Sequence, residues 1–273
     1  IGVVLDFPRF RQSLWSKAEE AGVEFLLGWR VSSVQSLKKG VLATLIGPNG
    51  VNQIRKVQWF VDATGYRRSF LGKRSSPSFS SGDHFLSGKG LEYLIQCDST
   101  SSNKWNEKIT FFLGSTWIQH GYGWIFPMGN DQLKVGVCRL PPPSRSPLPP
   151  LRTFLDHLLE INQLSKFKVL DRHGGVISSS LKRSETHSFG RIVGVGDVVS
   201  SANLLGGEGI RHAFQSADIL EPLLLKACLI KDLSKDVEQR LLWRYNKTIQ
   251  RNIGWRWEIS SRLARRTWWG LCD

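Results

Sequence analysis

The strongest chemical signal in the sequence is an acidic residue followed by a glycine cluster. The apolar segment 191–196 ends at Asp197. A strand there would bring the acid to the carboxyl edge of an open α/β sheet, where ligands bind. Glycines at a helix N-terminus let backbone amides approach an anionic or electron-rich group, while the Asp accepts a hydrogen bond from a ribose or ribityl hydroxyl. The alternative is a helix cap with a glycine-rich turn. The glycine cluster and the first helical residue are Gly206, Gly207, Glu208, Gly209 and Ile210.

A second candidate turn follows another short apolar segment. Residues 57–61 run into Asp62-Ala63-Thr64-Gly65. A small, polar turn that ends in glycine suits the close approach of backbone to a dinucleotide. The alternative is an ordinary turn at the end of a strand.

The third candidate is a row of aromatic residues. Strand alternation would place Tyr122, Trp124 and Phe126 on one face, with Pro127 next along the chain. Such a face can line an apolar ligand pocket. The alternative is that the three rings pack into the core of the sheet.

The elements that must position these residues alternate between helix and strand. Apolar residues at helical spacing predict a helix over 10–21, and short apolar runs bounded by turns predict strands. The basic, Ser-rich segment 67–81 is expected to be an exposed crossing between domains, and the Pro-rich segment 141–150 a stiff linker. The predicted strands are 23–27, 41–46, 57–61, 91–96, 109–113, 123–126, 133–138 and 175–181. Further helices are predicted at 151–164, from 210 onward and at about 237–271.

Composition limits the class of protein. The chain has 273 residues with 41% hydrophobic side chains, which is ordinary for a folded protein and excludes a disordered chain. Lys and Arg number 37 against 23 Asp and Glu, a net charge of +14 that favours an anionic partner. The four cysteines form no CxxC pair and the six histidines have no ligand spacing, so we expect free thiols, no metal site and a cytoplasmic location. No apolar run is long enough to predict a transmembrane helix.

In their order along the chain, these motifs resemble those of the geranylgeranyl reductase family of FAD-dependent oxidoreductases, within the aromatic-hydroxylase-like group of flavoproteins. That family carries a D-A-T-G turn, a Y-x-W-x-F-P segment and a G-D…N-P-x-x-G-E-G-I segment. They correspond here to Asp62–Gly65, Tyr122–Pro127 and Gly196–Ile210. The resemblance spans roughly residues 3–225.

The resemblance implies a role for each motif in holding FAD. Asp197 would contact the ribityl–pyrophosphate part, while Asp62 and Gly65 would lie close to the dinucleotide and Val31 near the adenine. The segment from Gly206 to Ile210 would present its backbone to the isoalloxazine ring. An isoprenoid chain would be lined by Tyr122, Trp124, Phe126 and Pro127. No catalytic residue is assigned.

Some of the family's features are missing. No G-x-G-x-x-G fingerprint precedes the first motif, so we expect an incomplete Rossmann-like domain, as from a truncated gene. Leu204 replaces the family's proline, and Met128 stands where a lysine often follows F-P.

The resemblance and the elements together predict a mixed α/β (α+β) fold in four parts. Residues 1–66 and 186–226 would form the two parts of the incomplete FAD-binding domain. Residues 67–185 would form an antiparallel-sheet substrate domain, and 227–273 a C-terminal helical region.

That helical region mixes Arg with Trp, as in Trp255, Arg256 and Trp257. Such a mixture favours peripheral contact with an anionic membrane, and the alternative is a helix that packs its rings on the protein body. No motif supports binding of nucleic acid.

The preferred function is reduction of carbon–carbon double bonds in an isoprenoid lipid chain, with electrons from NADPH or a reduced ferredoxin-like protein. One alternative keeps the scaffold but makes the protein a flavin monooxygenase, a halogenase or a carotenoid cyclase. Another is a basic, membrane-associated module that is not an enzyme.

Overall fold

The computed structural model of the chain describes residues 4–71, 83–141, 147–253 and 255–270. Its helices and mostly antiparallel sheets confirm the predicted mixed α/β class. The chain divides into two compact units. The predicted division into cofactor and substrate domains stays a prediction. The first unit comprises Ile1–Leu27, Gly88–Val176 and Trp268–Asp273, and the second comprises Gly28–Ser87 and Ile177–Thr267.

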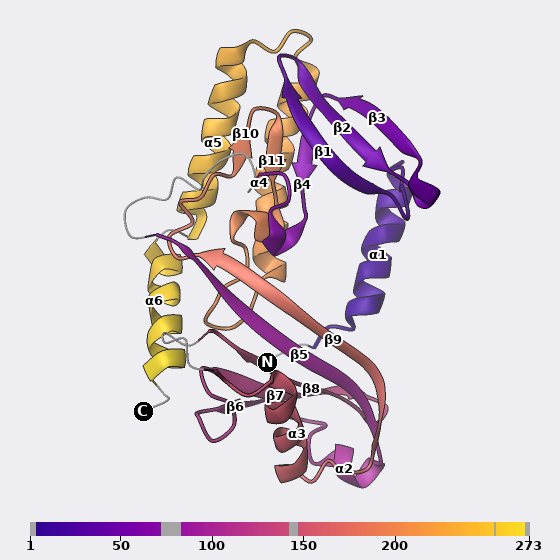
Figure 1. The fold of residues 1–273 in the computed structure, drawn as a ribbon, viewed down its shortest axis with the longest axis vertical. Coiled ribbons are helices and arrows are strands. Elements are labelled where there is room, and N and C mark those ends of the chain that lie inside the picture. The colour runs from indigo at the N-terminus through magenta and orange to yellow at the C-terminus, as the bar shows by residue number, and fades with distance from the viewer. Residues whose placement is uncertain (1–3, 72–82, 142–146, 254, 271–273) are drawn as a thin grey trace. The chain divides into compact units, whose positions relative to one another are not determined.

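A five-stranded sheet forms most of the first unit (Figure 1). Its strand order is β6-β7-β8-β5-β9, and the pairs β6–β7, β7–β8 and β8–β5 are antiparallel. The strands are β5 (Phe85–Cys97), β6 (Thr110–Leu113), β7 (Gly121–Gly129), β8 (Gln132–Arg139) and β9 (Phe167–Ser180).

One face of this sheet packs into the main apolar core. Ile125 of β7 and Leu133 of β8 are completely buried, together with Leu155 of helix α3 (Leu151–Ile161). Because side chains alternate along β7, the residues on either side of Ile125 point to the other face. The small helix α2 (Ser99–Asn103) follows β5.

Helix α1 (Phe7–Glu20) begins at the cap residue Asp6, whose carboxylate accepts a hydrogen bond from the amide of Arg9 at 3.2 Å. The segment after α1 was predicted as a strand at 23–27, and this prediction is wrong. Phe25 stacks on Trp15 of α1 with ring centroids 3.9 Å apart, so the apolar run packs back on the helix instead of pairing with a strand.

The second unit contains two sheets of three strands each. The first is an antiparallel meander of β1 (Arg30–Leu37), β2 (Gly40–Ile46) and β3 (Asn52–Val57). In the other sheet, β11 lies between β10 and β4. It pairs antiparallel with β10 and parallel with β4. The members of the second sheet are β4 (Phe60–Asp62), β10 (Ser188–Phe189) and β11 (Ile192–Gly194).

Two long helices pack against β11 (Figure 1). Val193 of β11, Leu220 of α4 and Ile249 of α5 share one apolar cluster. The buried Tyr245 of α5 donates a hydrogen bond to the carbonyl of Gly194 at 2.5 Å. The C-terminal helices are α4 (Ile210–Leu229), α5 (Lys235–Ile253) and α6 (Trp255–Gly270).

The structure changes two further expectations. Arg68 was expected on an exposed crossing, but its side chain is buried. The strand predicted at 175–181 begins much earlier, at Phe167 in β9. Of the predicted crossing and linker, residues 72–81 and 142–146 lie outside the described residues.

Candidate functional site

The parallel strands β4 and β11 bring two acidic residues to the same sheet edge. Gly194 at the end of β11 lies opposite Asp62 at the end of β4, and the amide of Val195 donates to the Asp62 carbonyl at 3.0 Å. Asp197 follows in the single turn η3 (Gly196–Val199). The sequence placed both acids at strand ends, and the structure makes those ends neighbours.

The carboxylate of Asp62 is fully occupied by its own loop. The side chain is completely buried and accepts hydrogen bonds from Thr64, both through its amide at 3.1 Å and through its hydroxyl at 2.6 Å. The amides of Phe70 and Leu71 donate to its other oxygen at 3.0 and 3.1 Å. Gly65, within this loop, has φ +69°, a conformation that favours glycine. The Asp62 carboxylate therefore shapes the turn. The predicted contact with a dinucleotide would have to come from other atoms of this turn, because the carboxylate is already occupied.

Asp197 is in the opposite situation. Its side chain is partly buried, and within the described residues no protein donor is hydrogen-bonded to its carboxylate. Burial raises the pKa of this carboxyl above its ordinary value. A Cβ added to Gly209 would lie 3.5 Å from Asp197 Oδ1, so the glycine backbone passes close to the acid. A carboxylate that is partly desolvated and unpartnered is a ready acceptor for a ligand hydroxyl.

The loop between η3 and α4 is folded around Asn203. The main-chain amide of Asn203 donates a hydrogen bond to the carbonyl of Glu208 at 2.6 Å. The side-chain oxygen of Asn203 accepts a hydrogen bond from the main-chain amide of Leu205 at 2.9 Å. Gly207 has φ +65°, and nothing lies within 4 Å of a Cβ built on Gly206. The loop is thus closed by its own backbone, while Gly206 leaves open space beside it.

Helix α4 starts at the end of this loop without a capping side chain. Gly209 is its N-cap, and Ile210 is 40% exposed. Glu208 is engaged with Arg211 through an ion pair of 2.7 Å on the surface. The amides of the first turn are therefore free of side-chain caps at the point where the glycines end.

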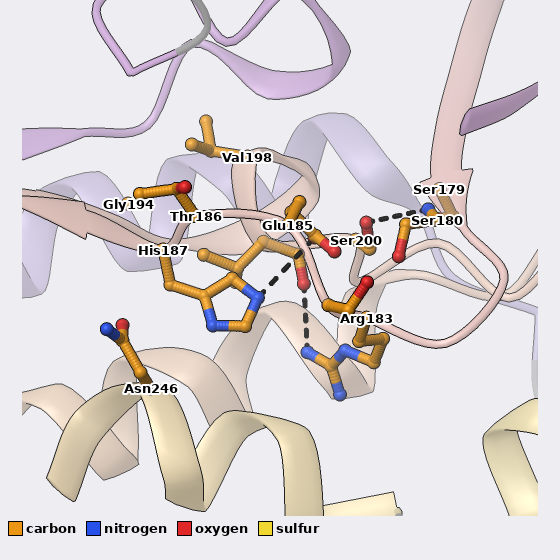
Figure 2. A network of polar contacts seen from close by, with 12 residues as sticks. Ser179, Ser180, Arg183, Glu185, Thr186, His187, Gly194, Val198, Ser200 and Asn246 are labelled. Carbon is orange, nitrogen blue, oxygen red and sulfur yellow. Dashed lines mark hydrogen bonds and ion pairs between the residues drawn. The ribbon is translucent and has the colours of Figure 1, made fainter. Parts of the chain in front are cut away.

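A buried cluster of charged residues lies behind η3 and was not predicted from the sequence. Glu185 is completely buried, 3.5 Å from Arg68 and 3.6 Å from His187, and Figure 2 shows Glu185 and His187 near Arg183. Burial acts to raise the pKa of Glu185, but the nearby His187, Ser200 and Arg68 outweigh it, so the net pKa is below its usual range. The sequence signal that could have indicated this cluster is the alternation of Arg183, Glu185 and His187 at every second position.

The two buried arginines hold the loop that carries Asp197. Arg68 donates to the carbonyls of Val198 and Thr186, and Arg183 donates to the carbonyl of Val199 at 3.0 Å. The hydroxyl of Ser200, a residue with φ +54°, accepts a hydrogen bond from the main-chain amide of Ser180 at 2.8 Å (Figure 2). These bonds fix the backbone directly after Asp197.

The first unit carries the predicted aromatic face. Tyr122, Trp124 and Phe126 lie along one face of β7, with neighbouring ring centroids 5.8 and 6.2 Å apart. Phe111 of β6 joins them, at 5.2 Å from Phe126, and its side chain is 52% exposed. Phe111 was missed by the sequence analysis, although it stands in a predicted strand beside Phe112. The predicted common face is confirmed, and its use for a substrate stays a prediction.

Trp124 is held in place by two features. Its indole nitrogen donates to Glu92 Oε2 at 2.8 Å. Its ring lies over Gly136 of β8, where an added Cβ would come within 2.2 Å of the ring. Only a residue without a side chain leaves room for the indole there.

Tyr122 is buried, and its hydroxyl contacts the thiol of Cys138. Burial raises the pKa of Tyr122 and raises that of the Cys138 thiol to about 12. Both groups therefore stay protonated at neutral pH.

Two predicted site residues, Pro127 and Val31, have yet to be placed. Pro127 lines an open cavity of about 520 Å³ in the first unit, beside Met128 and the start of α1. Val31 lies on β1, in the antiparallel meander and not at the edge that carries Asp197. By contrast, the turn that begins at Gly65 and the start of α4 both contact η3. The described residues contain no group of three or more His, Cys, Asp or Glu placed to hold a metal ion.

None of the protein-family models compared with the sequence matches it. The chain is 24% identical over 269 residues to digeranylgeranylglycerophospholipid reductase 2 of Methanothermobacter thermautotrophicus, covering 97% of this chain and 64% of that protein. The chain thus spans less than two thirds of the length of the curated relatives that it matches.

Solved structures share the fold. A geranylgeranyl bacteriochlorophyll reductase-like protein of Thermoplasma acidophilum superposes with a TM-score of 0.73 at 19% identity, covering 94% of this chain and 62% of that one. The flavin-dependent halogenase CmlS superposes with a TM-score of 0.62 at 16% identity, covering 89% and 43%. These comparisons bear out the resemblance to geranylgeranyl reductases. The fold is shared with solved structures that include a flavin-dependent halogenase.

Proposed function

We propose that this chain acts as an FAD-dependent oxidoreductase that saturates carbon–carbon double bonds of an isoprenoid lipid chain. The observation that carries the proposal is the state of Asp197. Asp197 follows β11 as a partly buried carboxylate to which none of the described residues donates a hydrogen bond, and it lies next to the glycine turn that opens α4.

The residues present fit a flavin dinucleotide. Asp197 offers an acceptor for a ribityl hydroxyl, and the uncapped amides of α4 suit an electron-rich ring edge or a phosphate. Open space at Gly206 and the left-handed backbone of Gly207 allow a flat ligand to approach the main chain. When bound, FAD supplies hydride-transfer chemistry.

The chain's own residues would bind and orient the partners of that chemistry. The clamp of Arg68 and Arg183 on the carbonyls of Val198 and Val199 keeps Asp197 in a fixed position. The aromatic face of β7 would hold an apolar chain and exclude water, with Trp124 fixed by Glu92. The relatives named as reductases of geranylgeranyl-type lipids support an isoprenoid as the substrate class.

The matching fold of a halogenase keeps an oxygen-dependent reaction, or a cyclase, as an alternative on the same scaffold. The alternatives differ in product. A reductase adds two hydrogens to each double bond, whereas a monooxygenase or a halogenase consumes oxygen, and a cyclase leaves the mass unchanged.

The test uses the purified chain with FAD and dithionite as the reductant, without oxygen, on lipids that carry geranylgeranyl chains. We expect products heavier by two hydrogens per double bond in mass spectrometry. NADPH and a reduced ferredoxin would then be compared as physiological donors. Trp124→Ala should raise KM for the lipid, while Trp243→Ala, an exposed Trp on α5, serves as the matched control. Product that forms only with oxygen would contradict the proposal.

A further inference from the structure

Helix α6 is anchored through one face. Trp257, Ser261 and Ala264 are 2%, 3% and 0% exposed. The indole of Trp257 donates to the carbonyl of Ser180 at 3.2 Å, and the guanidinium of Arg183 lies 4.9 Å from its ring centroid. This face holds α6 on the second unit.

The opposite face of α6 is also apolar. Trp255, Ile259 and Leu263 are 68%, 44% and 46% exposed and recur at every fourth residue. At ~100° per residue the three side chains span an arc of ~80°, centred ~170° away from the buried face. A helix that rests on a protein body normally turns polar residues to that side. Among the described residues nothing covers this stripe.

Arginines border and interrupt the stripe. On the same helical geometry Arg262 lies ~20° before Trp255, Arg256 lies ~20° beyond Leu263, and Arg266 lies between. The guanidinium of Arg256 sits 5.7 Å from the ring centroid of Trp255. The only acid in the sequence of α6 is Glu258, which pairs with Arg262 at 2.5 Å. The exposed face is therefore apolar and cationic together.

We propose that this face of α6, defined by Trp255, Ile259, Leu263, Arg256 and Arg266, docks on the surface of an anionic lipid bilayer. Lying parallel to the surface, the helix would place its three apolar side chains among the upper acyl segments and its guanidinium groups at the phosphates. Charge complementarity supports this occupant, because the chain carries a net charge of +14. No helix in the described ranges is long and apolar enough to cross a membrane, so contact through α6 would be peripheral.

Nucleic acid and protein fit the face less well. A polynucleotide backbone would use the arginines but would gain nothing from Ile259 and Leu263 between them. An ordinary apolar protein partner would leave Arg256 and Arg266 next to the buried contact. A bilayer interface satisfies both kinds of side chain at once. The inference stands apart from flavin binding and goes beyond the proposed function.

The experiment is co-sedimentation of the purified chain with vesicles of phosphatidylcholine alone or with added phosphatidylglycerol. We expect binding only to the anionic vesicles, and we expect this binding to weaken when salt is added. Arg256→Gln together with Arg266→Gln should weaken binding ~30-fold, from about 1 kcal/mol for each arginine. Trp255→Ala together with Leu263→Ala should weaken it at least ~10-fold because the inserted apolar area is lost.

Matched controls separate this face from charge and hydrophobicity in general. Trp243→Ala with Leu229→Ala removes an exposed Trp and an exposed Leu from other helices, and Arg9→Gln with Arg11→Gln removes the same charge from α1. Both controls should bind within twofold of wild type. Equal binding to neutral vesicles, or equal loss in variants and controls, would overturn the proposal. So would duplex DNA binding through the same arginines without vesicle binding. Circular dichroism confirms that each variant is folded.

Discussion

Asp62 ends strand β4 and Asp197 follows the adjacent parallel strand β11, yet the Asp62 carboxylate accepts four hydrogen bonds from its own loop and the Asp197 carboxylate accepts none from the described residues. Asp62 is used to build the edge of the sheet, and in the proposed function Asp197 would bind the ligand. This difference can be measured without any cofactor.

Asp62→Ala should lower the free energy of unfolding by about 3 kcal/mol, because it leaves the part-buried amide of Phe70 and the buried amide of Leu71 without an acceptor. Asp197→Ala should change stability by less than about 1 kcal/mol, because no donor among the described residues loses its partner. Urea denaturation followed by circular dichroism measures both. Equal destabilisation by the two variants would contradict the assignment of roles.

The raised pKa of Asp197 predicts a pH dependence with a definite sign. Its pKa is higher in the folded than in the unfolded chain, so the folded state binds the proton more tightly. That contribution is full below the unfolded pKa of about 4 and is lost as pH rises through the folded value. The free energy of unfolding of wild type relative to Asp197→Asn should therefore fall from about pH 3 to pH 6. A difference that rises over this range would refute the burial of this carboxylate.

Glu185→Gln should destabilise the chain by about 3–5 kcal/mol, because the charges of Arg68 and Arg183 stay buried without their carboxylate. Since the pKa of Glu185 is depressed, its stabilisation exists above the ordinary Glu pKa and is lost as pH falls toward the folded value. Glu258→Gln, which removes an exposed ion pair with Arg262, should cost less than about 1 kcal/mol. Thermal and urea unfolding compare the two; a similar small effect for both would show that the buried cluster is not a coupled unit.

Gly136→Ala should displace the ring of Trp124, since the new Cβ would lie 2.2 Å from it. The indole would then lose its bond to Glu92, and we expect a loss of about 1–3 kcal/mol from overpacking. Gly175→Ala is the matched control, because nothing lies within 4 Å of its added Cβ. Unfolding curves and near-ultraviolet circular dichroism report the stability and the indole environment. An unchanged near-ultraviolet spectrum in Gly136→Ala would mean that the ring does not rest on this glycine.

The parts of the site that depend on local pattern could be predicted from the sequence. Alternation placed Tyr122, Trp124 and Phe126 on one face, and the apolar run before Asp197 predicted the strand that became β11. The glycine cluster before Ile210 also predicted the start of α4.

The parts that depend on distant partners could not be predicted. Arg68 is buried through its contacts with Glu185 and Val198. These partners lie more than a hundred residues away in the sequence, so no local pattern around Arg68 indicates them. The apolar run 23–27 had the composition of a strand, but Trp15 offered a ring to pack against. The early part of β9 is mostly exposed, so it carries no apolar run to mark it as a strand.

Titration of FAD into the purified chain tests the central claim most directly. Wild type should shift the flavin absorption bands and quench flavin fluorescence at saturation. Asp197→Asn should bind ~10–100-fold more weakly, as expected for loss of a hydrogen bond to a charged acceptor. Glu258→Gln should bind like wild type. Absence of binding by the folded wild-type chain, or equal affinity in Asp197→Asn, would contradict the placement of the flavin at this loop.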